Sequence, residues 1–416
     1  MPLTRRSFLG ASGGAALSCC LPVQHWPRLA PHAPSTAEGK VLVVLFLRGG
    51  VDGLNFIVPY GDPHYRPLRE GLAIRRPGEA QGALDLDGFF GLHPAAGALQ
   101  PFFASGQAVA IHAVGHAQNS RSHFTEQDLW ETGTLDNTLR TDGWLNRHLA
   151  SRPGPGPIRA VAIGDGLPRI LRGDAEAIAI RGLSDLSLGG SSGPAVLAAL
   201  ERAYGGRAEE ASSALLGRSG RATLEALREL QSVANAPYSS AVEYPDTSLG
   251  RRLREIARLV KADIGLEIAA VDLGGWDTHQ NQGSSGGTFG ALVAQVAGAV
   301  AALARDLEHR MDDVLVLTIS EFGRTAAQNG TGGTDHGWGN CLLALGGPVH
   351  AAGGGTARNV LGRWPGLAPE ELHQGRDLEQ TTDFRDVFAE VARVHLGSPA
   401  VESLFPGRVF ERVGLV

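Results

Sequence analysis

The sequence has few cysteines, few lysines and no basic run. Its three cysteines are Cys19, Cys20 and Cys341, and the first two lie near the N-terminus. They cannot build a cysteine-based metal site, and Cys341 has no partner for an internal disulfide once the N-terminal segment is removed. Lys40 and Lys261 are the only lysines, and the net charge is −6. We therefore expect no nucleic-acid-binding surface.

The N-terminal segment has the features of an export signal. Thr4–Leu9 reads TRRSFL, which fits a twin-arginine motif, and a moderately apolar stretch follows over Phe8–Leu21. That stretch is too short and too weakly apolar to cross a membrane permanently, and ALSCC is a poor lipid-attachment motif. We expect residues 1–37 to be recognised by the twin-arginine export machinery and removed after Ala37, which predicts a periplasmic or secreted protein.

The rest of the chain alternates between strand-like and helix-like segments. Residues 289–307 carry apolar side chains at helical spacing, and residues 193–250 are expected to be a helical insertion that caps the sheet. The expected strands are 41–47, 109–114, 158–164, 266–273 and 314–319. This pattern predicts a three-layer α/β/α sandwich with a mainly parallel sheet in one domain, residues 38–416. The residues expected in its core include Trp130, Trp276, Trp338 and Cys341.

Charged and polar side chains follow four of the expected strands. In a parallel sheet these loops share one edge, so their side chains are expected to converge there. The residues are Asp52 after 41–47; His116, Ser120, Ser122 and His123 after 109–114; Asp277 and His279 after 266–273; and Glu321, Arg324, Asp335 and His336 after 314–319.

Six of these residues are the expected metal ligands, namely Asp52, Asp277, His279, Glu321, Asp335 and His336. Carboxylate oxygens and imidazole nitrogens suit zinc, manganese, magnesium or calcium, and we expect one or two divalent ions. Alternate residues of an extended loop can face the same way, so Asp277 and His279 could reach one ion. Structural alternatives remain open, since an aspartate can shape a turn, a histidine can lie at the surface, and Glu321 can pair with Arg324.

Ser122 and Arg324 are candidates for direct catalysis. Ser122 lies just before an expected helix, where backbone N–H groups stabilise an anion, and Ser120 and Thr125 are its rivals as nucleophile. Arg324 could clamp an oxyanion through two parallel hydrogen bonds. Two further candidates are less specific because surface histidines are common, and these are His116 and His123.

Several motifs together resemble one known family. TRRSFL, LRGGVDGLN, SRSHFTEQDLWE, GGWDTHQNQ, SEFGRT and NGTGGTDHGWGN occur in this order. They resemble the bacterial family known as domain of unknown function 1501, over about residues 40–415. That family is similar to the alkaline phosphatase superfamily, which includes phosphatases, sulfatases and cofactor-independent phosphoglycerate mutases. The resemblance implies one α/β/α domain and two metal ions around a serine, threonine or cysteine nucleophile.

The resemblance carries over to individual residues unevenly. Asp52 matches the N-terminal metal aspartate of the superfamily, and Ser122 lies near the position of the nucleophile. Asp277 matches the aspartate of an Asp-x-x-x-His type of metal motif, but His279 follows at a closer spacing.

The last motif admits two alignments. Thr334–Gly337 reads TDHG and resembles the superfamily's Asp-His pair, whereas Ser320–Gly323 reads SEFG and follows the strand that should precede that pair. We prefer the second alignment, because strand geometry constrains position more than two letters do. It places Phe322 where a histidine ligand is expected and makes His336 the late histidine ligand.

The sequence therefore predicts an exported, metal-dependent hydrolase that acts on a small anionic phosphate or sulfate ester. Phe322 favours a second hypothesis, a periplasmic binding or assembly protein that keeps the fold and one structural ion. A transferase or mutase that uses the same site is a third hypothesis.

Overall fold

The computed structural model describes residues 39–416, apart from 137–139, 153, 155–157, 187–210 and 354–357. The expected export signal at Thr4–Leu9 and its cleavage after Ala37 lie outside the described residues and stay predictions. The same holds for residues 193–210 of the expected helical insertion.

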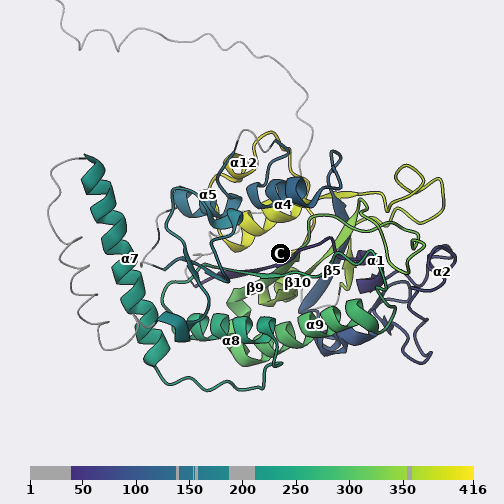
Figure 1. Cartoon of the computed structure of the whole chain (residues 1–416), viewed down its shortest axis with the longest axis horizontal. Coiled ribbons are helices and arrows are strands. Elements are labelled where there is room, and N and C mark those ends of the chain that lie inside the picture. The colour runs from purple at the N-terminus through teal and green to yellow at the C-terminus, as the bar shows by residue number, and fades with distance from the viewer. Residues whose placement is uncertain (1–38, 137–139, 153, 155–157, 187–210, 354–357) are drawn as a thin grey trace, which may run out of the picture. The chain divides into compact units, whose positions relative to one another are not determined.

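A nine-stranded sheet forms the centre of the described chain (Figure 1). Its strands are β1 (Val41–Leu47), β5 (Ala108–Gly115), β6 (Ala160–Ile163), β7 (Ile178–Ile180), β8 (Ile268–Leu273), β9 (Val314–Ile319), β10 (Asn340–Gly346), β11 (Val360–Leu361) and β12 (Thr382–Asp383). The order is β11-β5-β10-β9-β1-β8-β6-β7, and β12 also pairs with β5. Strand β10 runs antiparallel to β5 and β9, and all other pairings are parallel.

This arrangement confirms the predicted α/β class with a mainly parallel sheet. The expected strands 41–47 and 314–319 match β1 and β9, and the other three differ from β5, β6 and β8 by one or two residues at their ends. The reversed strand β10 was not predicted. A second, small sheet consists of β2 (Ile57–Val58), β4 (Gly91–Leu92) and β3 (Leu84–Asp85), in that order.

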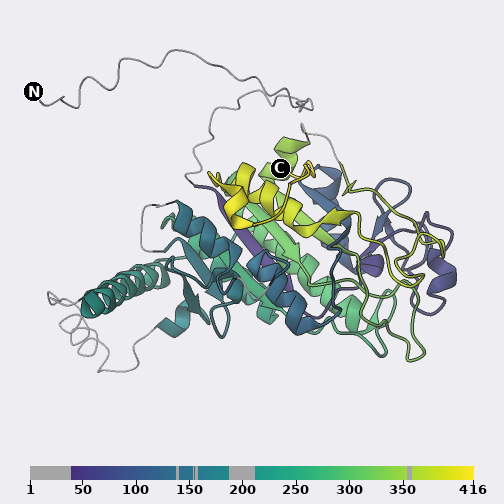
Figure 2. The ribbon, with the colours of Figure 1, turned by 90° about the horizontal axis from the view of Figure 1, so that it is seen from above.

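Helices cover both faces of the large sheet (Figures 1 and 2). Along β1, Val43 and Leu45 join the core under α8 (Ser248–Lys261) and α9 (Gly287–Leu307), while Leu42 and Val44 join the opposite core. That second core is packed by α5 (Trp144–Ser151), α11 (Phe384–Glu390), the π-helical turn η5 (Val391–His395) and α12 (Val401–Leu404). Because successive strand residues point to opposite faces, an entirely apolar strand such as β1 can supply both cores.

Shorter helices and one long helix complete the described elements. They are α1 (Gly53–Phe56), α2 (Tyr65–Leu68), η1 (Pro94–Leu99), α3 (Gln100–Ala104), α4 (His123–Thr132), η2 (Arg169–Leu171), η3 (Leu183–Leu186), α7 (Ala211–Asn235), η4 (Glu308–Asp313) and α10 (Gly347–Ala352). Within the expected helical insertion, α7 is helical, and residues 236–247 are irregular.

Helix α9 confirms the helix expected over 289–307 and lies in the first core. Together with η4 it is the one described segment that is long and apolar enough to cross a membrane. Most of it is buried, and it packs against α8 and η1. The buried apolar surface of α9 is therefore that of a core helix.

Asp306 of α9 anchors the irregular segment that precedes α8. Its buried carboxylate accepts hydrogen bonds from Tyr238, from Tyr244 at 2.9 Å and from the backbone N–H of Ala241 at 3.0 Å. Lys261 of α8 donates to the same carboxylate at 2.6 Å. One side chain thus ties the end of the α7–α8 connection to both helices of the first core.

Asp306→Ala should destabilise the protein by about 2–4 kcal/mol, because hydrogen bonds to a buried charged group are each worth roughly 1.5–3 kcal/mol and part of this is regained by water. Urea unfolding would measure the change. Asp313→Ala is the matched control, since the ion pair between Asp313 and Lys40 is partly exposed and is expected to contribute below about 1 kcal/mol. Equal stabilities of the two variants would contradict the anchoring role.

Candidate metal centre

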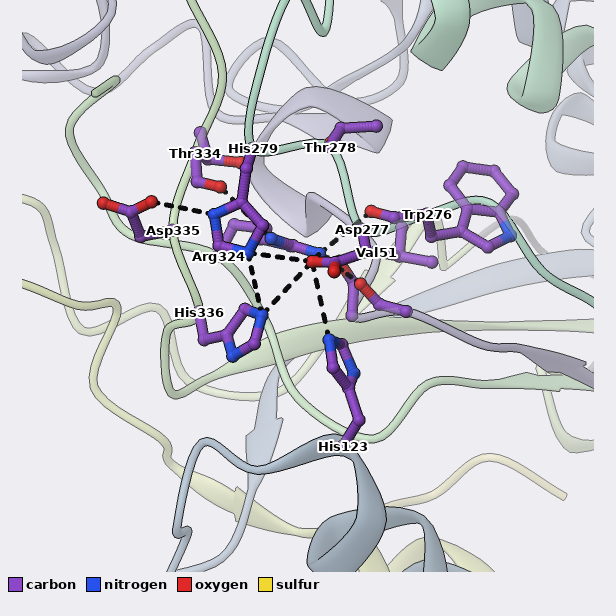
Figure 3. A network of polar contacts seen from close by, with 12 residues as sticks. Val51, His123, Trp276, Asp277, Thr278, His279, Arg324, Thr334, Asp335 and His336 are labelled. Atoms are coloured by element: carbon purple, nitrogen blue, oxygen red, sulfur yellow. Dashed lines mark hydrogen bonds and ion pairs between the residues drawn. The ribbon is translucent and has the colours of Figure 1, made fainter. Parts of the chain in front are cut away.

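Four loops meet at one edge of the large sheet. Strands β1, β5, β8 and β9 all run in the same direction, so their C-terminal ends lie together. The segments that follow these strands carry the polar residues singled out from the sequence. The parallel topology thus brings residues more than 200 positions apart, such as His123 and His336, into one cluster (Figure 3).

The cluster is built around one carboxylate oxygen, Oδ1 of Asp277. The Nε2 atoms of His279, His336 and His123 lie 3.0, 3.2 and 3.4 Å from it, and those of His279 and His336 are 3.0 Å apart. His123, Asp277 and His336 each place a ligand atom within 4.8 Å of the others. Two imidazole nitrogens and one carboxylate oxygen thus form the mutual group, and His279 adjoins it through Asp277 and His336.

The outer nitrogen of each imidazole faces a hydrogen-bond acceptor. Nδ1 of His123 lies 2.7 Å from Glu321, Nδ1 of His279 lies 2.9 Å from Asp335, and Nδ1 of His336 lies 2.8 Å from the carbonyl oxygen of Arg121. In the neutral form each ring donates its Nδ1 proton outward, which leaves a bare Nε2 lone pair facing inward. Metal-bound histidines are held in this way.

Two observations show that these residues fit a metal ion. Nε2 of His123 is buried and has no hydrogen-bond partner, although buried polar atoms are nearly always paired. Tetrahedral bonds of about 2.0–2.1 Å to zinc would hold the ligand atoms about 3.3 Å apart. The separations of 3.0–3.4 Å between Oδ1 of Asp277 and the three imidazoles agree with that spacing, and the ligand atoms that all lie within 4.8 Å of one another are those of His123, Asp277 and His336.

The electrostatics keep Asp277 ionised. Partial burial acts to raise the pKa of Asp277, but the hydrogen bond and charge of Arg324, with help from His279 and His123, lower that pKa to about 2. Partial burial also lowers the pKa of His336, which favours its neutral form. The hydrogen bond to Glu321 raises the pKa of His123. Of His123 and His336, it is therefore His123 whose charged form the surroundings favour.

Arg324 has a different place from the predicted clamp on a substrate. It is almost fully buried, and its Nη2 donates to Asp277 at 2.7 Å. Its remaining hydrogen bonds go to the carbonyl oxygens of Gly49, Gly50, Trp276 and Thr334. Because its donors are already engaged, Arg324 orients Asp277 and does not present a free guanidinium to a substrate.

Asp52 also differs from its predicted role, because it lies in a buried ion pair. Its Oδ2 accepts hydrogen bonds from Nη1 of Arg69 and from Nε2 of Gln282, both at 2.6 Å. Both Asp52 and Arg69 are fully buried. A guanidinium therefore neutralises this aspartate, and the structure does not bring it into the cluster around Asp277.

Glu321 and Asp335 reach the site as outer carboxylates and not as members of the inner cluster. Oε1 of the buried Glu321 accepts hydrogen bonds from the backbone N–H of Gly49 at 2.9 Å and from Gln127 at 2.8 Å, in addition to its contact with His123. Asp335 holds His279 from the outside. Both residues therefore contact imidazoles of the cluster, and their role as metal ligands stays a prediction.

The predicted nucleophile region forms the start of α4. Ser122 is the residue directly before this helix, and its side chain makes no capping hydrogen bond. Ser120 donates to Glu126 at 2.7 Å, and the buried His116 pairs with the same carboxylate at 2.5 Å. Thr125 lies inside the helix and is partly buried. Of the three candidate nucleophiles, Ser120, Ser122 and Thr125, Ser122 is the one that directly precedes His123 in the chain.

His123 was not among the expected metal ligands, although its Nε2 faces Asp277 and it belongs to the group of potential ligands. It follows Ser122 at the start of α4, on a loop that the pattern of strands had already placed at this edge of the sheet. Phe322, expected to replace a histidine ligand, packs its ring against His123 and His336 at centroid distances of 4.8 and 4.9 Å. The presence of a histidine on each of the three loops was the available signal.

Close packing beneath the cluster requires a glycine at position 50. Gly50 has φ +67°, and a Cβ atom there would lie 2.5 Å from the ring of Phe322.

The expected core residues are confirmed, since Trp130, Trp276, Trp338 and Cys341 are all buried. Burial raises the pKa of the Cys341 thiol, which is inert in this setting.

Substitution of Asp52 should lower the stability of the protein but not its metal binding, whereas substitution of His279 should lower metal binding but hardly change stability. Asp52→Asn leaves the buried Arg69 unpaired, so we expect it to destabilise the metal-free protein by about 3–5 kcal/mol while metal binding persists in the folded fraction. His279→Ala removes a half-exposed ion pair worth below about 1 kcal/mol but should abolish or strongly weaken metal binding. Chemical unfolding and elemental analysis measure the two effects, and loss of metal in Asp52→Asn at full stability would restore its predicted role as a ligand.

Comparison with known proteins places the chain in a family without assigning an activity. No curated protein matches it. One solved structure, described as "Crystal structure of Ps i-CgsB in complex with k-i-k-neocarrahexaose", aligns at 13% identity over 91% of this chain and 74% of that chain, with a TM-score of 0.36. A likeness of this degree carries no conclusion about function. The model of the family "Protein of unknown function (DUF1501)" matches residues 39–399, and the chain belongs to that family.

Proposed function

We propose that this protein is an exported, metal-dependent hydrolase of a phosphate or sulfate ester. The observation that carries the proposal is the inward-facing set of three Nε2 atoms around Asp277, each imidazole being fixed from outside by a separate acceptor. The similarity to the alkaline phosphatase superfamily, the twin-arginine route and the periplasmic location are parts of the same proposal.

The donor set favours zinc or a similar transition metal over magnesium or calcium. Imidazole nitrogens suit zinc, whereas magnesium and calcium prefer oxygen ligands. The proposed ligands are His123, Asp277, His279 and His336. The side chains of Asp277 and His279 are 46% and 37% exposed, so a small ester can approach the centre from solvent. A bound zinc ion would supply Lewis acidity and stabilise negative charge on the ester.

The residues of the chain have distinct tasks in this proposal. Ser122 is the candidate nucleophile, because its hydroxyl lies at the N-terminus of α4, where backbone N–H groups favour an anion. Arg324 holds Asp277 in its ionised form, and Glu321 fixes the ring of His123. Hydrolysis adds the elements of water across the ester and releases an alcohol and the free anion.

A specific observation also favours the alternative, a binding or assembly protein with a structural ion. With His279 as a fourth ligand beside His123, Asp277 and His336, the proposed ion would have four protein ligands, which is typical of structural zinc, whereas catalytic zinc keeps an open position. Arg324 is also unavailable to bind an anion. The exposure of Asp277 is the reason to prefer the catalytic reading, since structural zinc sites are usually closed.

Metal content and turnover test the proposal together. We expect the exported protein, dialysed without chelator, to hold about one equivalent of zinc, and to hydrolyse aryl phosphate or aryl sulfate model esters. Asp277→Ala should lose the metal and the activity. Ser122→Ala should keep the metal and lower the rate by at least about 100-fold, because it removes only the proposed nucleophile.

The matched control is Ser184→Ala, a serine of η3 outside the proposed centre. It should leave both metal content and rate unchanged. One tightly held equivalent without turnover of any ester would favour the binding protein. Failure to bind metal after reconstitution with zinc, manganese, magnesium or calcium would overturn both readings.

A further inference from the structure

We propose that Arg121 is a positioning residue for His336, and that it acts through its backbone carbonyl and not through its charge. The inference rests on the proposed metal centre, because His336 is one of its four ligands. Arg121 is the second residue of the SRSHFTEQDLWE motif, in the loop between β5 and α4, and it was not among the candidate site residues.

The backbone of Arg121 has an unusual conformation. Its φ is +57°, in the left-handed region that residues with a Cβ atom rarely adopt. In this conformation the carbonyl oxygen of Arg121 lies 2.8 Å from Nδ1 of His336. The hydrogen bond requires a proton on Nδ1, which leaves Nε2 bare and directed at Asp277. The strained backbone thus selects the tautomer that can bind a metal.

The side chain of Arg121 holds this conformation in place. Its Nε and Nη2 donate to Oδ2 of the buried Asp377 at 3.0 and 2.6 Å. Its guanidinium lies 4.9 Å from the ring centroid of Trp338, only two residues beyond His336. Two hydrogen bonds to one carboxylate oxygen and an aromatic face together fix the direction of the side chain. Asp377 and Trp338 therefore act as a clamp on residue 121.

The loop carrying Arg121 is also tied to the loop of His336. The backbone N–H of Arg121 donates to Oδ1 of Asn119 at 2.7 Å, and Nδ2 of Asn119 lies 3.5 Å from the carbonyl oxygens of Gly337 and Trp338. The carbonyl of Arg121 and the ring of His336 thus belong to two loops that contact each other at several points. Rotation of the 121 peptide would have to break these contacts.

Two substitutions at position 121 separate the effect of the backbone conformation from the effect of the side chain. Arg121→Ala and Arg121→Gly both remove the clamp, but only alanine keeps the Cβ atom that disfavours a positive φ. We expect Arg121→Ala to bind zinc about 10–100-fold more weakly than the wild type. Arg121→Gly should bind zinc about 5–30-fold more tightly than Arg121→Ala, because glycine adopts the left-handed conformation freely. Competition with a chromophoric zinc chelator measures these affinities.

A second readout uses the metal-free protein and does not depend on activity. In protein with ¹⁵N-labelled histidine, at mildly alkaline pH, the long-range ¹H–¹⁵N pattern reports which ring nitrogen carries the proton, and the spectrum of His336→Gln identifies the signal of His336. We expect protonation at Nδ1 in the wild type and in Arg121→Gly, and a mixture of tautomers in Arg121→Ala. Asp377→Asn, which leaves residue 121 unchanged, should weaken zinc binding and shift the tautomer in the same direction.

The proposal would be overturned by equal zinc affinities of the alanine and glycine variants, or by wild-type His336 protonated at Nε2. Circular dichroism checks that each variant is folded, and Asp377→Asn decides the question if the alanine variant is not. A wild-type protein that binds no zinc would count against the proposed function, but the tautomer of His336 in the metal-free protein would still decide the role of Arg121.

Discussion

The buried guanidinium of Arg324 is the constraint on which the candidate metal centre depends. It bonds to carbonyl oxygens in the loops after β1, β8 and β9 and to the carboxylate of Asp277. A buried charge is costly unless its hydrogen-bonding capacity is used, so these loops can lie only where their carbonyl oxygens reach it. The position of Asp277, and with it the point on which three imidazoles converge, follows from that requirement.

The same arrangement leaves the centre with a charge that suits a divalent cation. Asp277, Glu321 and Asp335 contribute three carboxylates, and Arg324 contributes one positive charge. With neutral histidines, the formal balance is two negative charges. The hydrogen bond to Glu321 raises the pKa of His123, which favours a positive charge on that ring when no ion is bound. Metal binding would require His123 to be neutral.

The sequence was sufficient to predict which loops meet, but not which atoms meet. Strand bounds followed closely from the apolar runs, because a strand buried on both faces is apolar throughout. The partner of Asp52 was not predictable, since Arg69 lies in a segment without any motif. The hydrogen bond between Glu321 and His123 was not predictable for a similar reason. A shift of a carboxylate by about 2–3 Å decides whether it binds an ion directly or holds a histidine ligand, and strand topology does not determine side-chain positions to that precision.

The ion pair of Asp52 with Arg69 bears on how many ions the fold can hold. Two-metal centres need carboxylates that stay free to bind the second ion. Here Arg69 already neutralises Asp52, and Phe322 packs its apolar ring where another ligand was expected. Among the described residues, one cluster of potential ligands remains, around Asp277. In the proposed hydrolase, transition-state charge on an ester would then have to be stabilised by a single ion, by the N-terminus of α4 and by the imidazoles. The precise orientation of each imidazole therefore matters more here than in a two-ion site.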